Sequence, residues 1–293
     1  MNIRFEPYGK QPSAFGARFE MVRAFLLDVN RETIINSNFL WPRWEWAKSI
    51  MLLFRGSADE NGLWFDGDRM VALAANEDSQ GSAFFILRPG YEFLKPEMLR
   101  YASEAFQKEG KTRLLICDAD VALQELAVHA GYCASEKSEK TSVIDLTARN
   151  LGYSLPEGFH VRSLADGYDV RKLDRCTYRG FGNGDEPPQT EENVDYQGPN
   201  FDTALHTVVE APNGDYAAYA GTWYDSSTNY AYVEPVCTDP LYRKMGCARA
   251  ALYAGLRRCA ERGAKRAYVI SQQQFYYRIG FAPRDTYTWW EKP

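Results

Sequence analysis

One short segment, residues 234–248, constrains the fold of this chain more than any other part of it. β-favouring residues lead up to Pro240, an Arg-x-x-Gly-x-Ala sequence occupies residues 243–248, and small or apolar residues then recur at helical spacing as far as Cys259. This order predicts a strand, a glycine turn and an amphipathic helix. Because the first N–H groups of a helix lack partners and carry the positive end of the helix dipole, such a turn is suited to bind an anion such as pyrophosphate.

The same segment resembles the acetyl-CoA loop of the GCN5-related N-acetyltransferases, the GNAT superfamily. The loop of that family reads Arg/Gln-x-x-Gly-x-Gly/Ala, and residues 243–248 read Arg-Lys-Met-Gly-Cys-Ala. Downstream, residues 275–281 read Phe-Tyr-Tyr-Arg-Ile-Gly-Phe and resemble the family's Tyr-x-x-x-Gly-Phe motif. The resemblance covers roughly residues 157–293. It departs at residues 271–274, where Ser-Gln-Gln-Gln replaces the common Asn-x-x-Ala.

The two halves of the chain repeat one pattern. Residues 108–116 are echoed by residues 261–269, and Arg-Pro-Gly-Tyr-Glu at 88–92 stands where Asp-Pro-Leu-Tyr-Arg stands at 239–243. With 293 residues the chain has room for two domains of ordinary size. We therefore predict two tandem acetyltransferase-like domains, 1–150 and 151–293. Each is expected to be α+β (mixed α/β), with a mixed, mostly antiparallel sheet flanked by helices.

The first copy differs from the second where the cofactor loop should be. After Tyr91 it continues with Glu-Phe-Leu-Lys-Pro at 92–96, without a glycine turn, so a carboxylate stands in the place of Arg243. A carboxylate there repels a pyrophosphate. The first domain is thus expected to be a degenerate copy that acts as a scaffold and as one wall of the acceptor cleft.

Strands are predicted where β-favouring runs are bounded by turn residues. In the first half they are residues 62–65, 69–75, 82–87, 113–117 and 142–146. In the second half they are residues 160–163, 204–210, 216–223, 231–238, 267–271 and 286–291, with a hairpin turn at 212–215.

Two residues are the candidates for acid–base chemistry. An alkyl amine of pKa about 10.4 must lose a proton before it can attack a thioester, which costs about 4.6 kcal/mol at pH 7. Glu234 is the candidate base, because it lies on the strand that leads to the loop and shares a face with Thr238. The alternative is an exposed or ion-paired strand glutamate. Tyr276 is the candidate acid for the departing thiolate. Tyr277 is its competitor, and either tyrosine could instead anchor the last helix.

The resemblance also implies which residues bind acetyl-CoA. The backbone groups of Val236, Cys237 and Thr238 would pair with the pantetheine amides like an added strand. The loop would bind the pyrophosphate through its N–H groups and positive side chains. Its members are Arg243, Lys244, Met245, Gly246, Cys247 and Ala248.

Composition excludes several other classes of protein. The chain carries 34 basic and 39 acidic residues, and no basic cluster alternates with aromatic residues, so nucleic acid is not expected as a partner. The six cysteines and three histidines show no metal-binding spacing, so we expect no metal. No apolar run is long enough to span a membrane, and the first residues do not resemble a signal peptide, which favours a cytoplasmic protein with reduced thiols.

Residues 180–200 form a long acidic stretch without Lys, with Asp185, Glu186, Glu191, Glu192 and Asp195. It is either a solvated surface loop or part of an acceptor site for a cationic amine. We therefore expect an acetyl-CoA-dependent N-acetyltransferase that acts on a primary amine of a small cationic molecule, with a homodimer as one candidate assembly. Two alternatives stay open, a non-catalytic acyl-CoA-binding module and a protein N-acetyltransferase.

Overall fold

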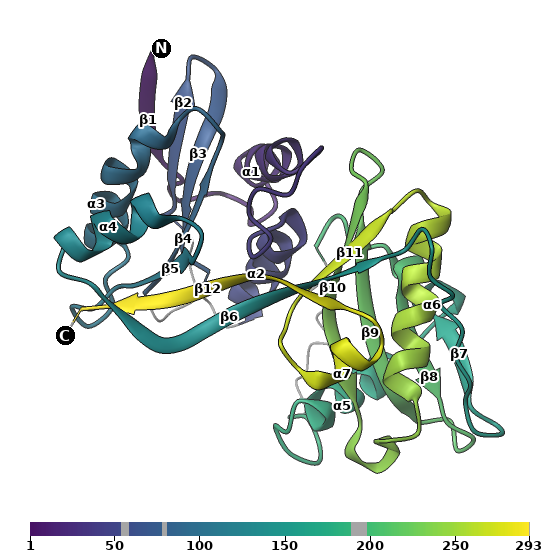
Figure 1. Cartoon of the computed structure of the whole chain (residues 1–293). Helices are drawn as coiled ribbons and strands as arrows, with labels where there is room; N and C mark the ends of the chain where they lie inside the picture. The colour runs from purple at the N-terminus through teal and green to yellow at the C-terminus, as the bar shows by residue number, and fades with distance from the viewer. Residues whose placement is uncertain (54–58, 78–80, 189–197, 293) are drawn as a thin grey trace. The chain divides into compact units, whose positions relative to one another are not determined.

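The structure is a computed structural model that describes residues 1–53, 59–77, 81–188 and 198–292. The chain divides into two compact units (Figure 1). Unit 1 comprises Met1–Thr141 together with Pro283–Pro293, and unit 2 comprises Ser142–Ala282. Each unit is a mixed sheet with helices on its faces, so the predicted fold class is confirmed.

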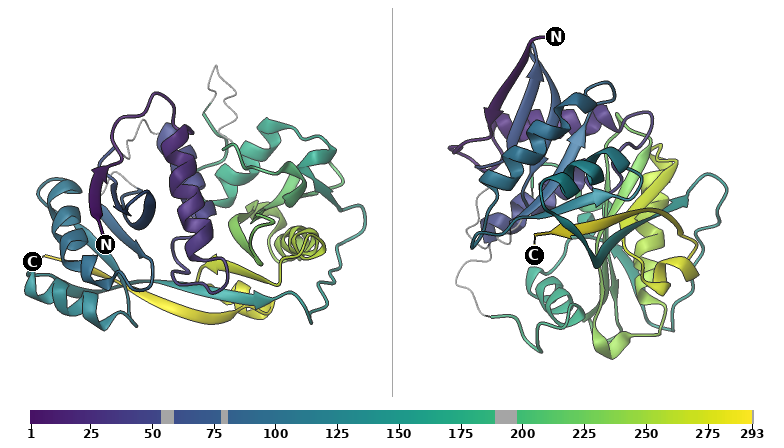
Figure 2. Two further views of the ribbon diagram at one scale, coloured as in Figure 1. Left: turned by 90° about the horizontal axis from the view of Figure 1, so that it is seen from above. Right: turned by 60° about the vertical axis from the view of Figure 1, so that its left-hand side comes forward.

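Unit 1 is built on seven strands of the described chain. In spatial order they are β1 (Ile3–Pro7), β2 (Gly62–Asp66), β3 (Arg69–Ala75), β4 (Ser82–Leu87), β5 (Arg113–Cys117), β12 (Ala282–Glu291) and β6 (Cys133–Asp145). The successive pairs from β1 to β5 are antiparallel except β4 and β5, which run parallel. Helices α3 (Lys95–Ala105) and α4 (Val121–His129) cover one face, and α1 (Ala17–Val29) and α2 (Trp41–Leu53) lie on the other (Figure 2).

Unit 2 repeats this arrangement. Its strands in spatial order are β7 (His160–Ser163), β8 (His206–Glu210), β9 (Tyr216–Tyr224), β10 (Tyr230–Thr238) and β11 (Arg266–Ile270), followed by the end of β6. The described pairs are again antiparallel except the pair that β10 forms with β11. Helix α6 (Cys247–Glu261) covers one face, α5 (Val170–Gly180) lies on the other, and α7 (Gln274–Arg278) follows β11.

The internal repeat is therefore visible in the strand order, but the last strand of each half is exchanged. β12, which ends the second half of the chain, pairs with β5 of unit 1. The final residues of β6, which ends the first half, lie beside β11 of unit 2, where Leu146 N–H donates to the Lys265 carbonyl. This exchange explains why the compact units include a distant piece of sequence. The domains 1–150 and 151–293 describe the repeat in chain order and stay a prediction.

Most predicted strands are confirmed to within about two residues, including the hairpin turn, where Ala211 N–H donates to the Asp215 carbonyl. Two strands differ. β1 is not predicted, because five residues at the edge of a sheet leave little pattern. β6 begins at Cys133 instead of Ser142, since its polar first part is held by pairing with a neighbouring strand and not by burial.

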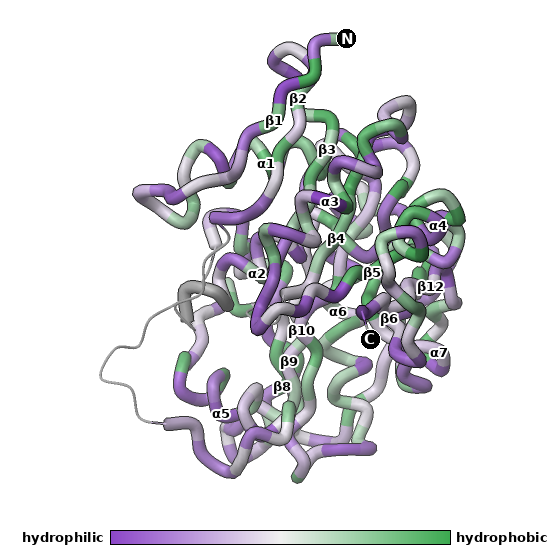
Figure 3. Tube along the Cα trace, turned by 90° about the vertical axis from the view of Figure 1, so that its left-hand side faces the viewer, coloured by the Kyte–Doolittle hydropathy of each residue, from purple (hydrophilic) through white to green (hydrophobic). Residues whose placement is uncertain are grey.

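The glycine turn and the helix that follows it are confirmed. Gly246 caps α6 with φ of 84°, a left-handed conformation that favours glycine. The helix lies close to the sheet because the residues on its inner face have small side chains. A Cβ at Gly255 would come within 2.7 Å of the Thr222 hydroxyl oxygen. In Figure 3 the strands β8 to β10 are largely green, which marks a hydrophobic layer, whereas α5 is mostly purple.

His206, on β8, is a fully buried histidine that the sequence does not single out. Its Nδ1 lies 2.6 Å from the Tyr219 hydroxyl, its ring packs against Phe201 and Trp223, and its Nε2 has no hydrogen-bond partner in the described part of the chain. Burial lowers its pKa from 6.5 to about 3, and nearby Asp202 offsets this only in part. The folded state therefore keeps this imidazole neutral.

This burial predicts that unit 2 loses stability in mild acid. Below pH 6.5 the unfolded chain binds a proton at His206 that the folded chain refuses, so stability falls as the pH drops toward 3. Between pH 7 and pH 5, the titration of this group lowers the free energy of unfolding by about 2 kcal/mol. The His206→Gln variant should lack the part of the pH dependence of stability that comes from His206. Hydrogen exchange of β8 and β9 peptides, corrected for intrinsic rates, measures it, and equal pH dependence in parent and variant would contradict the assignment.

Candidate active site

The candidate site begins where two parallel strands of unit 2 diverge. β10 and β11 pair from Tyr230 to Tyr232, and no described residue of β11 pairs with β10 beyond that point. On the other side of β10, the register with β9 shifts between Val233 and Val236, so Glu234 and Pro235 bulge. A Cβ at Gly221 of β9 would collide with the Glu234 carbonyl, which is why the bulge needs glycine opposite it. The bulge turns part of β10 away from regular pairing.

Glu234 is held at this bulge by two hydrogen bonds. The Tyr232 hydroxyl donates to Glu234 Oε2 over 2.6 Å, and the indole N–H of Trp223 donates to the Glu234 carbonyl over 2.7 Å. The side chain is half-buried. Neither partner was predicted, because both contacts depend on the bulge and not on sequence spacing. A carboxylate fixed in this way is oriented before any substrate arrives.

Tyr276 lies on α7 with only 7% of its surface exposed, and its hydroxyl has no hydrogen-bond partner among the described residues. Burial raises the pKa of its phenol, and the negative charge of Glu234 raises it further. The charge of Glu234 thus acts on the phenol of Tyr276. A raised pKa keeps the phenol protonated at neutral pH, which is the state that can donate a proton. For Tyr277 the structure shows a half-buried side chain on the same helix.

The Tyr-x-x-x-Gly-Phe motif has a structural reason. Gly280 has φ of 98° and ends α7, so that Phe281 N–H donates back to the Tyr276 carbonyl over 3.0 Å. The rings of Phe281 and Tyr276 then meet edge to face at 5.4 Å. The motif thus fixes the position of the tyrosine ring.

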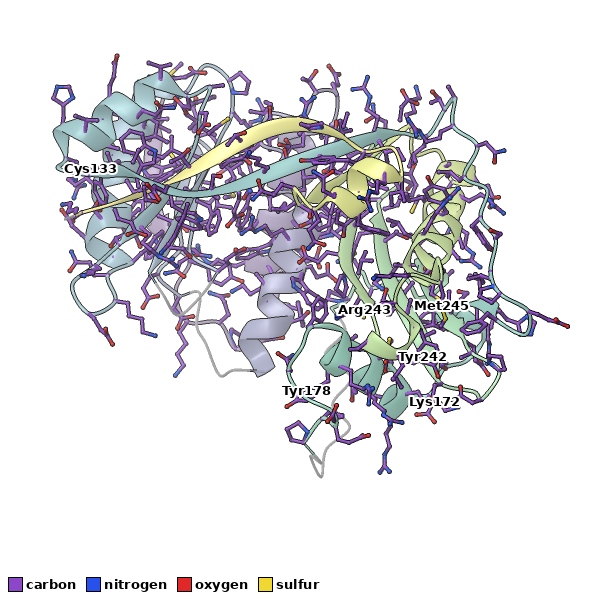
Figure 4. The ribbon with its side chains drawn as sticks, turned by 60° about the horizontal axis from the view of Figure 1, so that its bottom comes forward. Cys133, Lys172, Tyr178, Tyr242, Arg243 and Met245 are labelled. Atoms are coloured by element: carbon purple, nitrogen blue, oxygen red, sulfur yellow. The ribbon has the colours of Figure 1, made fainter. Side chains whose placement is uncertain are left out.

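The glycine loop fits an anionic group. Lys244 and Gly246 have positive φ, and no described residue accepts a hydrogen bond from the backbone N–H groups of Lys244, Met245 or Gly246. A Cβ at Gly246 would meet only the Ser154 carbonyl at 3.5 Å, so the space before the loop is open. Figure 4 shows Arg243 and Met245 in this loop, and both are exposed. The Arg243 guanidinium donates to the Gly180 carbonyl over 3.2 Å.

The remaining predicted contact residues offer their backbones and not their side chains. Val236, Cys237 and Thr238 pair with β9 on one side and face the divergence on the other. Cys237 is buried, with its sulfur 4.0 Å from that of Cys176 on α5, and Cys247 is buried at the start of α6. Ala248 is half-buried in the first turn of that helix.

A contact that the sequence does not reveal joins α5 to the start of the loop. Arg179 Nε lies 2.7 Å from Asp239 Oδ2, and both side chains are largely buried. Asp239 also accepts a hydrogen bond from Leu241 N–H. Gly180 packs directly on β10, since a Cβ there would lie 2.8 Å from the Cys237 Cβ. The end of α5 therefore braces the strand that carries Glu234.

Part of the acidic stretch lies outside the described residues, namely Glu191, Glu192 and Asp195. Within the described part, Glu186 Oε1 lies 2.9 Å from Arg175 Nε on α5. The described residues contain no group of His, Cys, Asp and Glu side chains that could hold a metal ion. None of the described helices combines the length and the apolar character that crossing a membrane requires.

Comparison with known proteins bears on the family and on the fold. Residues 168–281 match the family model described as the acetyltransferase (GNAT) family, so this part of the chain belongs to that family. No curated protein matches the chain. Among solved structures, a GCN5-related N-acetyltransferase from Sphaerobacter thermophilus aligns over 99% of this chain and 95% of its own, with 16% identity and a TM-score of 0.62.

Two further structures also align along the whole chain. A tandem GNAT protein from the clavulanic acid biosynthesis pathway has 13% identity over 99% of this chain and 98% of its own, with a TM-score of 0.61. A GNAT-family acetyltransferase from Colwellia psychrerythraea has 12% identity over 100% of both chains, with a TM-score of 0.60. At these identities the likeness shows the fold alone. It shows that the tandem arrangement extends over both halves.

At the matching positions, the described residues of unit 1 lack the groups that form the site in unit 2. β4 and β5 diverge after Phe84, and the residue two positions later, as Glu234 follows Tyr232, is the buried Ile86. Helix α4 contains no tyrosine. Glu92 accepts a hydrogen bond from Gly90 N–H, and the N–H groups of Glu92 itself and of Gly90 lower the pKa of this carboxyl. A carboxylate of the chain thus occupies loop donors that an anionic ligand would need.

Proposed function

We propose that this protein is an N-acetyltransferase that transfers the acetyl group of acetyl-CoA to a primary amine of a small cationic molecule, by direct attack in unit 2. The family match indicates acetyltransferase activity. The observation that carries the proposal is a divergent strand edge that presents the Glu234 carboxylate, followed by an open glycine loop at the start of α6. The proposal includes a cytoplasmic location and a possible homodimer.

In this mechanism Glu234 accepts the proton of the ammonium group, directly or through a water molecule. Tyr276 then donates its proton to the thiolate that leaves. Val236, Cys237 and Thr238 hold the pantetheine arm, and the residues from Arg243 to Ala248 hold the pyrophosphate. For Arg243 to join them, its guanidinium must leave the Gly180 carbonyl.

Two observations favour a small cationic acceptor, the first through its size and the second through its charge. One structural neighbour is named for a pathway that makes a small molecule. The described acidic residues of the 180–200 stretch, Asp185 and Glu186, are exposed and favour a positive charge nearby. If this stretch is instead a solvated surface loop, it does not constrain the charge of the acceptor.

The proposed function is tested by incubating the protein with acetyl-CoA and a panel of amines, while free thiol is followed. The panel should contain polyamines, aminoglycosides, amino sugars and a basic peptide. We expect turnover with at least one small amine, and none with the corresponding alcohols. Calorimetric binding of acetyl-CoA without turnover of any amine would favour the non-catalytic module, and turnover of the peptide alone would favour a protein acceptor.

The Tyr276→Phe variant tests the acid. Because the hydroxyl has no partner among the described residues, its removal should leave the fold and acetyl-CoA affinity unchanged. Its loss should lower kcat by about 10² as the thiolate leaves without a proton donor. The measurement is kcat with the accepted amine, together with calorimetry of acetyl-CoA. Tyr277→Phe is the matched control on the same helix, and a larger loss there would transfer the role to Tyr277.

A further inference from the structure

Unit 1 retains an open pocket where its strands β4 and β5 diverge, although it has lost the groups for catalysis. The pocket has a volume of about 330 Å³, at the lower end of the range for small-molecule sites. It extends from the ends of both strands to the first turns of α3 and α4. Apolar side chains form much of its wall, namely Ile35, Phe85, Leu87, Pro89, Leu115 and Leu123.

Among the described residues of the pocket wall, the charged groups are two carboxylates and one ammonium group. Glu92 and Asp120 line it, and Lys95 is the one basic residue in its wall. Lys95 Nζ already lies 2.7 Å from Asp120 Oδ1, and this ion pair joins the N-termini of α3 and α4. The same Asp120 oxygen also accepts a hydrogen bond from Leu123 N–H, so Asp120 is bound from both sides. The exposed Glu92 carboxylate is not neutralised by an ion pair among the described residues.

The thiol of Cys117, which also lies in the pocket wall, is close to further carboxylates. Burial raises the pKa of Cys117, and the carboxylates of Asp285, Asp118 and Asp120 add to this rise. Among the described residues that line the pocket, two carboxylates, Glu92 and Asp120, therefore face one cation, Lys95. The field in the pocket is negative.

This combination excludes a ligand such as coenzyme A. A pyrophosphate would meet the Glu92 carboxylate on the loop N–H groups and an ion pair between the two helices. A positive charge on a small apolar body would instead meet both an attractive field and apolar walls. Ile35 shows that the apolar walls can contribute, because 44% of its surface is exposed and a bound apolar group could cover it.

We propose that the pocket of unit 1 is a binding site for a small amphipathic amine, of about ten non-hydrogen atoms, whose ammonium group lies toward Glu92 and whose apolar part lies against Phe85, Leu87 and Leu115. The amine binds there without reacting, since Ile86 stands where unit 2 has Glu234 and α4 has no tyrosine to match Tyr276. This proposal does not depend on the function proposed for unit 2.

The test is calorimetric titration of the full chain with three compounds of one shape, 2-phenylethylamine, 2-phenylethanol and 3-phenylpropionate, at low ionic strength. We expect a Kd for the amine between about 10 μM and 1 mM, at least fivefold weaker binding of the alcohol, and no saturable binding of the acid. Equal binding of the acid and the amine, or no saturable binding of any of the three, overturns the proposal.

Variants locate the site and separate it from unit 2. Glu92→Lys should weaken amine binding about three- to tenfold, whereas Glu104→Lys, the same charge change at the exposed far end of α3, should leave it unchanged. Glu234→Gln should also leave it unchanged, and an effect there would place the amine in unit 2. Coupling N-ethylmaleimide to Cys117, in protein with Cys133→Ser, should abolish binding. Amine binding that survives both Glu92→Lys and the coupling overturns the proposal.

Discussion

Gly246→Glu is expected to weaken acetyl-CoA binding by about 100-fold or more while unit 2 stays folded. Gly246 caps α6 in the left-handed conformation, and the space before its Cβ position is open. A glutamate there would place bulk and negative charge in front of the N–H groups that a pyrophosphate needs. Calorimetry with acetyl-CoA measures the loss, and circular dichroism checks the fold.

Unit 1 supplies a matched control for this variant. Gly90 has φ of 89° and no atom within 4 Å of a built Cβ, so Gly90→Glu brings the same backbone strain and the same charge. Because Glu92 already occupies the loop donors there, acetyl-CoA affinity should not change. Equal losses in the two variants would show that the effect is general strain or that both units bind acetyl-CoA. Gly246→Ala separates strain from charge, and it should cost much less affinity than the glutamate.

The sequence predicted the local elements of this fold well, because most of them are determined by short-range pattern. The helix after Gly246 follows from small and apolar residues at helical spacing, and the hairpin at 212–215 follows from its turn residues. The exchange of β12 and β6 was not predictable in this way. Which strand a segment pairs with depends on contacts far apart in sequence, and β12 reads equally well as a strand of either unit.

The candidate site shows the same division. The glycine loop, Glu234 and Tyr276 were all found from motifs that order residues along the chain. The bulge that lets Tyr232 and Trp223 hold Glu234 was indicated only by Pro235, and the partners themselves carry no sequence signal. Arg179 and Asp239 are sixty positions apart, so their ion pair depends wholly on how α5 packs against β10. The contacts that support the candidate site are thus the features that could not be predicted from the sequence.

Glu234→Gln is expected to lower kcat/KM for the accepted amine by about 10² or more near pH 7. The change keeps the shape of the side chain and an oxygen that can accept the Tyr232 hydrogen bond, so the bulge should be preserved. What it removes is the group that takes the amine's proton. At pH 7 the neutral form of an alkyl amine lies about 4.6 kcal/mol above the ammonium form in free energy. A base in the site therefore contributes most to the rate near this pH.

The pH dependence distinguishes a base from a merely structural glutamate. As the pH rises toward the pKa of the amine, the free amine becomes abundant and the deficit of Glu234→Gln should shrink. Tyr276→Phe should behave differently, since the thiolate needs its proton donor at every pH below the raised pKa of that phenol. The measurement is kcat/KM from pH 6 to pH 10 for the parent and both variants. A deficit that stays constant over this range would assign Glu234 to positioning, and activity within twofold of the parent in both variants would exclude both roles.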